Sequence, residues 1–125
     1  MIVGSVVNMG LVMLSPVAIP PPGGADTTTV EGLNASIHLF EAKHFIFPFL
    51  AHALGTLVGA LVAALISTGS KLTVALIVGV MFLLGGISAA WMIAAPMWFE
   101  ALDILLAYIP MAWIGGRLGG AGRAA

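Results

Sequence analysis

The chain alternates long apolar stretches with short polar gaps, and this alternation predicts membrane-spanning helices. A helix needs about 17–25 mostly apolar residues to cross a bilayer. Four stretches have this character, at about residues 2–19, 45–67, 72–95 and 96–116. A signal peptide is the alternative for the first stretch, but no Lys or Arg precedes it. We therefore predict an all-α integral membrane protein, with one transmembrane domain over residues 1–125 and four transmembrane helices in a compact bundle.

The longest polar connection, residues 20–43, has a pattern of its own. It opens with prolines and glycines at residues 20–24, which cannot continue a helix. Thr28 and Glu31 then fit a capping box, in which two side chains satisfy the first free amides of a helix. Apolar residues follow at spacings of 3, 4 and 3, which places them on one helical face: Val30, Leu33, Ile37 and Phe40. We expect a short amphipathic helix over about residues 29–43, lying at the membrane interface in the first external loop.

Prolines and glycines inside the apolar stretches predict where helices bend and where they touch. Pro48 lies in the first turn of the second stretch and predicts a bend near residues 44–48. Pro110 deprives the Leu106 carbonyl of its amide partner, so we expect a kink in the fourth stretch. Gly55 and Gly59 form a G-x-x-x-G pattern, which is typical of close contact between two membrane helices.

Composition supports lipid as the solvent of this chain. Hydrophobic residues make up 61% and charged residues 7%, whereas a soluble domain carries about 25% charged residues. We therefore expect membrane lipid as a binding partner, with bound lipid retained on the protein. The net charge of -1 gives no footprint for nucleic acid. Since there is no cysteine, disulfides, thiolate metal sites and thiol catalysis are excluded together.

The few charges are segregated along the chain, and this predicts a topology. All five acids fall in or beside two of the gaps: Asp26, Glu31, Glu41, Glu100 and Asp103. Three of the four basic residues fall in the other gap and the tail: Lys71, Arg117 and Arg123. Basic residues favour the cytoplasmic side of a membrane protein. We expect both termini in the cytoplasm and the loop at residues 20–43 outside, with Lys43 as the exception.

Six side chains at the external edge combine imidazole and carboxylate groups, which together suit a divalent transition metal. They are His38, Glu41, His44, His52, Glu100 and Asp103. Glu41 and His44 form one Glu-x-x-His unit, which is half of the pattern that di-iron bundles use. The alternative is a polar interfacial helix with ordinary hydrogen bonds, in which Glu41 pairs locally with Lys43 or His44.

His52 is a separate case because it lies some two turns inside the second apolar stretch. Ionisable residues at membrane depth usually face a cavity or a partner, which makes His52 a functional candidate. Its alternative is a neutral imidazole that donates to a carbonyl or to Asp103 across the bundle. For Asn8 and Thr56 we expect hydrogen bonds between helices.

The stretch from His38 to Thr56 resembles segments of small, uncharacterised bacterial four-helix inner-membrane proteins. The resemblance implies a bacterial inner-membrane protein and supplies no activity. No motif identifies a reaction, so an enzyme is the less favoured interpretation.

Two function classes remain. The first is a structural or accessory helical subunit, which packs against itself or against other membrane protein subunits. The alternative is a small metal-binding or transport protein that uses the six-residue site at the external edge.

Overall fold

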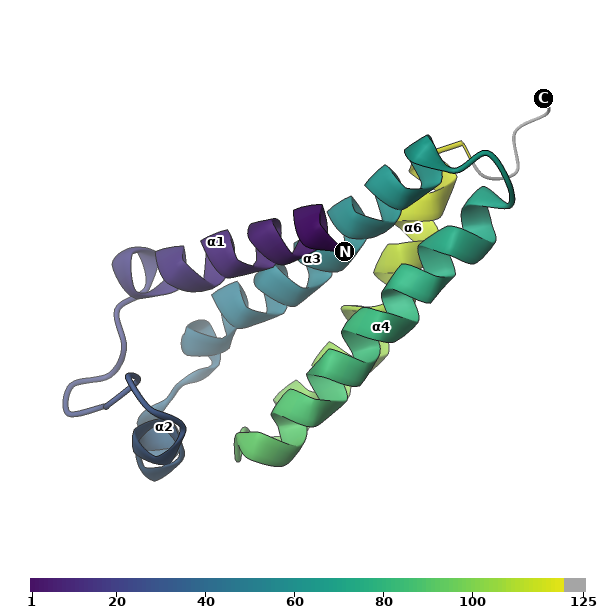
Figure 1. Cartoon of the computed structure of the whole chain (residues 1–125). Helices are drawn as coiled ribbons and strands as arrows, with labels where there is room; N and C mark the ends of the chain where they lie inside the picture. The colour runs from purple at the N-terminus through teal and green to yellow at the C-terminus, as the bar shows by residue number, and fades with distance from the viewer. Residues whose placement is uncertain (121–125) are drawn as a thin grey trace.

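The computed structural model describes residues 1–120, which are mainly helical and contain no β-strand (Figure 1). Its elements are α1 (Ile2–Ala18), α2 (Val30–Ser36), the 3-10 helices η1 (Ile37–Leu39) and η2 (Ala42–Phe45), α3 (Ile46–Ile66), α4 (Lys71–Met92), α5 (Met97–Leu106) and α6 (Ile109–Leu118). The all-helical expectation is therefore confirmed. Arg123, which we expected in the cytoplasm, lies outside the described residues.

Three helical segments are long and apolar enough to cross a membrane: Ala42–Ile66, Lys71–Met92 and Met97–Leu118. They correspond to the second, third and fourth apolar stretches. The first stretch forms α1, which has 17 residues. At 1.5 Å per residue its length is about 26 Å, a little less than the roughly 30 Å of a bilayer core.

The connection at residues 20–43 differs from the single amphipathic helix expected over residues 29–43. Helix α2 begins after Thr29, whose hydroxyl accepts the Gly32 amide at 2.9 Å. Thr28 instead donates to the carboxylate of Asp26, so the expected capping box of Thr28 and Glu31 is wrong. Beyond η1 the backbone is extended at Phe40 and Glu41 before η2 leads into α3. The loop thus contains two short helical segments, α2 continued by η1 and then η2, because local side-chain hydrogen bonds cap the ends of the helices.

The proline predictions have different outcomes. Pro48 is the third residue of α3, where a missing amide costs little, and the helix break lies at residues 40–41 rather than at 44–48. Pro110 does interrupt the fourth stretch, as expected. Helix α5 ends at Leu106, Tyr108 has φ -112° and ψ -77°, and α6 begins at Ile109. The fourth stretch therefore consists of two helices, α5 and α6, separated by irregular backbone at residues 107–108.

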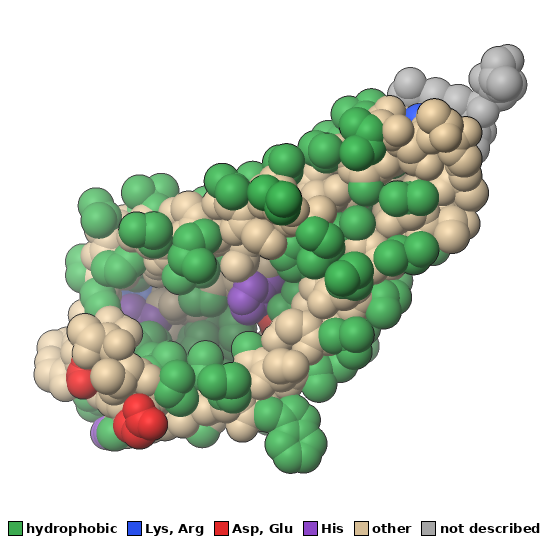
Figure 2. Space-filling view, viewed as in Figure 1, with side chains coloured by type: hydrophobic (Ala, Val, Ile, Leu, Met, Phe, Trp, Pro, Cys, Tyr) green, Lys and Arg blue, Asp and Glu red, His purple; other side chains and the backbone are tan. Residues whose placement is uncertain are grey.

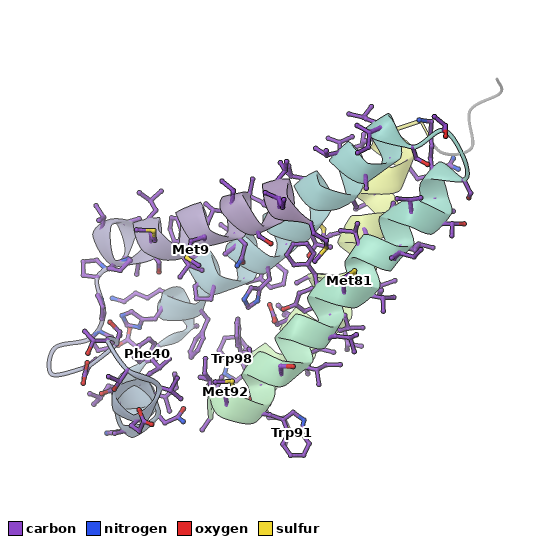
Figure 3. The ribbon with its side chains drawn as sticks, viewed as in Figure 1. Met9, Phe40, Met81, Trp91, Met92 and Trp98 are labelled. Carbon is purple, nitrogen blue, oxygen red and sulfur yellow. The ribbon has the colours of Figure 1, made fainter. Side chains whose placement is uncertain are left out.

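Small residues form the contacts between helices. A Cβ built on Gly4 of α1 would lie 2.5 Å from the Gly55 carbonyl and 3.0 Å from Gly59, so the G-x-x-x-G contact is confirmed. A Cβ on Gly115 of α6 would likewise lie 2.5 Å from the Leu57 carbonyl of α3. The buried residues of α3 are all small: Ala51, Ala53, Gly55, Thr56, Gly59, Ala60 and Ala64. Because backbones approach this closely, large side chains are pushed outward, and Trp91 points away from the bundle with 88% of its surface exposed (Figure 3).

The bundle has two dissimilar ends. At the closed end, α3 and α4 meet in the turn at residues 67–70, and the Lys71 ammonium donates to the carbonyls of Ala64 (2.7 Å) and Ser67 (3.3 Å). At the open end, α3 and α4 lie farther apart, and α2 sits beside them (Figure 1). Acidic side chains gather at the open end in Figure 2, in keeping with the segregation of charge along the sequence.

Candidate functional site

A cavity of about 270 Å³ lies at the open end, and all five helices from α1 to α5 contribute to its wall. Figure 2 shows a hollow in this region with histidine side chains along it. Most of the lining is apolar. The polar lining residues are four of the six site candidates: His44, His52, Glu100 and Asp103. The remaining two candidates, His38 and Glu41, are exposed and do not line the cavity.

The wall of the cavity contains a hydrogen-bonded group that we call the polar cluster, formed by His52, Asp103 and Tyr108. The Nδ1 atom of His52 lies 2.9 Å and 3.0 Å from the two carboxylate oxygens of Asp103. The Tyr108 hydroxyl donates to Oδ2 of the same carboxylate at 3.0 Å. Asp103 is only 5% exposed and Tyr108 only 1%. The contact between His52 and Asp103, which the sequence offered as one alternative, is thus formed across the bundle.

The break between α5 and α6 is what brings Tyr108 to Asp103. On an unbroken helix, residues five positions apart point about 140° away from each other. The irregular backbone at Tyr108 removes this phase difference. Gly86 of α4 makes room for the ring, because a Cβ at that position would overlap the Tyr108 side chain. The His52 and Tyr108 rings stack with their centroids 5.8 Å apart, so the imidazole is held on one side by a phenol.

The arrangement fixes which nitrogen of His52 can meet a ligand. Both hydrogen bonds of its ring to described residues involve Nδ1, and both lead to Asp103. When Nδ1 carries the proton, it donates to the carboxylate and Nε2 keeps a free lone pair. The side chain is 26% exposed, although the carboxylate beneath it is almost fully buried. His52 therefore combines a fixed orientation with access to the cavity.

The other candidates either bond to nearby residues of the loop or have no bonded partner for their side chain. His44 accepts the Glu41 amide through Nδ1 at 2.8 Å, and Glu41 pairs with Lys43 at 3.7 Å, so the local pairing that we considered is present. Glu100 lines the cavity, and its side chain makes no hydrogen bond or ion pair with any residue of the described range. Across residues 1–120, no three His, Asp or Glu side chains come close enough to hold one metal ion. The six candidates therefore do not form one metal centre in this arrangement.

Two polar residues behave differently from expectation. The Thr56 hydroxyl donates to the His52 carbonyl of its own helix at 2.7 Å, rather than to a neighbouring helix. The Asn8 side-chain oxygen is buried and has no hydrogen-bond partner among the described residues. The Asn8 backbone and Cβ instead pack against Gly55. The expected hydrogen bonds between helices are therefore not formed by either residue.

An aromatic group flanks the cavity where the loop meets α5. The rings of Phe45 and Phe99 have centroids 4.7 Å apart, and Trp98 meets Phe45 edge-on at 5.6 Å. Phe40 adds a further contact to Phe45 at 5.9 Å. Figure 3 shows Phe40 and Trp98 at this end of the bundle. These rings connect the loop to α5, and Phe40, Phe45 and Phe99 also line the cavity.

Tyr108 is the functional residue that sequence reasoning missed. It stands among apolar residues and belongs to no recognisable motif. The only available hint was Pro110, which predicted a kink close enough to change the direction of Tyr108. Comparison with known proteins adds nothing to this geometry, since no family model, curated protein or solved structure matches the chain.

Proposed function

We propose that this is an integral membrane protein that binds a small, largely apolar molecule in the cavity at its open end. In this proposal the polar cluster supplies the polar end of the site. The observation that carries it is the position of the cluster, a nearly buried hydrogen-bonded carboxylate in the wall of an otherwise apolar cavity. Ligand sites commonly have this composition, mostly apolar with a few fixed polar groups.

Energetics favour a functional over a packing role for the cluster. Burying a carboxylate, an imidazole and a hydroxyl costs free energy that hydrogen bonds only offset. Apolar side chains would pack the same helices without that cost. The three residues also come from α3, α5 and the break between α5 and α6, and Thr56 and Gly86 support them from two helices. Such convergence is expected of a site that must orient a ligand.

The membrane setting is part of the proposal. Three helices are long and apolar enough to span a bilayer, and we propose α1 as a fourth, shorter span. Even numbers of spans place both termini on one side, and the basic residues of the closed end favour the cytoplasm. The open end then faces the outside of a bacterial inner membrane. Reporters fused after Ala125 test this: a reporter active only in the cytoplasm should work, and one that requires export should not.

A cavity-filling substitution tests the binding proposal directly. Ala90 lines the cavity, whereas Ala101 is exposed on α5 and does not. We use two probes of nearly equal shape, the cation benzyltrimethylammonium and its neutral carbon isostere neopentylbenzene. The protein in lipid nanodiscs should bind at least one of them, measured by tryptophan fluorescence with empty nanodiscs subtracted. Ala90→Phe should abolish binding and Ala101→Phe should not. Equal binding in both variants, or no binding of either probe to the unaltered protein, would contradict the proposal.

A second candidate function is a structural or accessory subunit, and the surface of α1 favours it. Helix α1 packs mainly along α3 and leaves large apolar side chains uncovered, among them Ile2 (81% exposed), Met13 (71%) and Val17 (78%). Lipid or a second protein would cover them equally well. Purification in mild detergent should then recover a defined oligomer or a stable partner. A monomer without a partner would count against this candidate and leave the cavity proposal unaffected.

A further inference from the structure

We infer that the ligand of the cavity is an organic cation with an apolar body, such as a substituted ammonium ion. The inference rests on the proposed function and names the substrate class of that same site. It comes from the charges of the lining. Two carboxylates, Glu100 and Asp103, line the cavity from the same helix, and no Lys or Arg does so.

The two carboxylates differ in how well the protein satisfies them. Asp103 already accepts hydrogen bonds from His52 and Tyr108. Glu100 is partly buried and has no such partner among the described residues. A carboxylate that leaves water without a partner is unfavourable, so a positively charged ligand would supply what the chain does not.

The basic residues of the described range are occupied elsewhere. Lys43 pairs with Glu41 on the exposed loop, at 3.7 Å. Lys71 is bound to the carbonyls at the end of α3, at the closed end. Arg117 lies over the Trp113 ring, 5.5 Å from its centroid. None of them is available to neutralise the cavity.

The rest of the lining suits the apolar body of such a cation. Phe40, Phe45 and Phe99 contribute aromatic surface near Glu100, and aromatic faces attract organic cations. The volume of about 270 Å³ is near the lower end of the roughly 300–1,000 Å³ found for ligand pockets. It therefore admits a molecule of about the size of one ring with a small ammonium group.

Other ligand classes fit less well. An anion would approach two carboxylates, and no Lys or Arg of the described residues lines the cavity to receive it. A neutral molecule would displace water from the Glu100 carboxylate without supplying a positive charge to replace that hydration. A bare metal ion needs several converging ligands, which the described residues do not bring together. An organic cation pairs its charge with the carboxylates and packs its apolar body against the apolar lining.

The two probes and a charge-neutral variant test the inference. We expect the unaltered protein to bind benzyltrimethylammonium about tenfold more tightly than neopentylbenzene, which corresponds to ~1.4 kcal/mol. Glu100→Gln should weaken binding of the cation about fivefold, the upper range for a partly exposed ion pair, and should leave the neutral probe unchanged. Trp98 reports binding because it packs on Phe45, a lining residue.

Controls separate charge from folding. Glu31→Gln removes an exposed carboxylate of α2 outside the cavity and should leave both probes unchanged. If Glu100→Gln fails to fold, Glu100→Asp keeps the charge on a shorter side chain and should retain the preference for the cation.

Three outcomes would overturn the inference. If the neutral probe binds as tightly as the cation, the ligand class is wrong while the cavity proposal stands. If neither probe binds, both proposals fall. If Zn²⁺ binds stoichiometrically and His52→Ala removes it, the site takes a metal ion instead.

Discussion

The two ends of this bundle are built from the same apolar helices, yet the helices pack tightly at one end and leave a cavity at the other. At the closed end, glycine and alanine let the backbones of α3, α4 and α6 touch, and Gly116 and Ala75 meet where larger residues would not fit. At the open end the helices leave a cavity, and a polar cluster stands in its wall. The close contacts at the closed end fix the positions of the helices, and these positions leave a cavity between the helices at the open end. The stability of the molecule should therefore depend most on the closed end, and its binding should depend on the open end.

The largest expected effect comes from filling the helix seam at the closed end. In Gly115→Leu the new side chain would meet the Leu57 carbonyl of α3, and backbone cannot move aside as a side chain can. We expect a loss of about 3 kcal/mol in the free energy of unfolding, at the high end for overpacking. Gly85→Leu is the matched control, because a Cβ there meets nothing within 4 Å. Reversible unfolding in detergent mixtures measures both, and equal losses would show that the seam does not determine stability.

The polar cluster, which lies at the open end, should give the next largest effect on the free energy of unfolding. In Asp103→Leu, both His52 and Tyr108 lose their partner, and stranding buried polar groups costs about 2 kcal/mol. Glu100→Leu on the same helix is the control and should cost nothing comparable, since Glu100 has no bonded partner in residues 1–120.

A double-mutant cycle makes the cluster prediction sharper. Tyr108→Phe alone should cost about 0.6 kcal/mol, the average for hydrogen bonds between membrane helices. In the Asp103→Leu background the same change should cost almost nothing, because the hydroxyl no longer has an acceptor. Unchanged costs in the two backgrounds would mean that the hydrogen bond at 3.0 Å contributes no stability.

Much of the closed end could be predicted from the sequence. The apolar stretches located α3 and α4 to within a few residues, and Gly55 and Gly59 marked a real contact. These features depend on local composition: length and hydropathy define a span, and a glycine pair on one face permits close approach. Pro110 was also predictive, because it has no amide to offer the Leu106 carbonyl, and α5 ends at Leu106.

The open end was less predictable, because its geometry depends on long-range placement. Tyr108 reaches Asp103 only after the break has changed the phase of α6. Thr28 fits the sequence pattern of a cap, but Asp26 competes for its hydroxyl, and Thr29 takes the role. The cavity itself follows from the angle between α3 and α4, which no hydrophobic pattern specifies. The contact between His52 and Asp103 was one of the alternatives considered from the sequence, because both residues were expected at the same edge of the bundle.

A smaller effect should come from the contact between the loop at residues 20–43 and the end of α4. The Asn34 side chain donates to the Met92 carbonyl and accepts the Ala94 amide, both at 2.9 Å. Asn34→Ala should speed hydrogen exchange of the Ala94 amide about fivefold, because hydrogen bonds of this kind contribute about 1 kcal/mol. Global stability should change little, and Glu31→Ala on the same helix should leave this amide unchanged. Exchange that is unaltered in Asn34→Ala would show that the loop is held by its apolar residues alone.

The smallest effect is a dependence on pH that should be confined to the same loop. The hydroxyl and the amide of Thr28 both donate to the Asp26 carboxylate, and these bonds hold the pKa of Asp26 below its ordinary value of 3.8. A carboxyl group whose pKa is lowered by folding stabilises the folded loop above the ordinary value, and that stabilisation is lost as the pH falls through the lowered pKa. Thr28→Val should raise the pKa of Asp26 toward 3.8, measured by NMR titration of its carboxyl carbon, because the hydroxyl is the larger cause. Thr27→Val, one residue away and without a hydrogen bond to Asp26, should leave the titration unchanged. An acid-induced change that began instead at the glycine contacts of the closed end would contradict the division between the two ends, since no Asp or Glu side chain of residues 1–120 lies there.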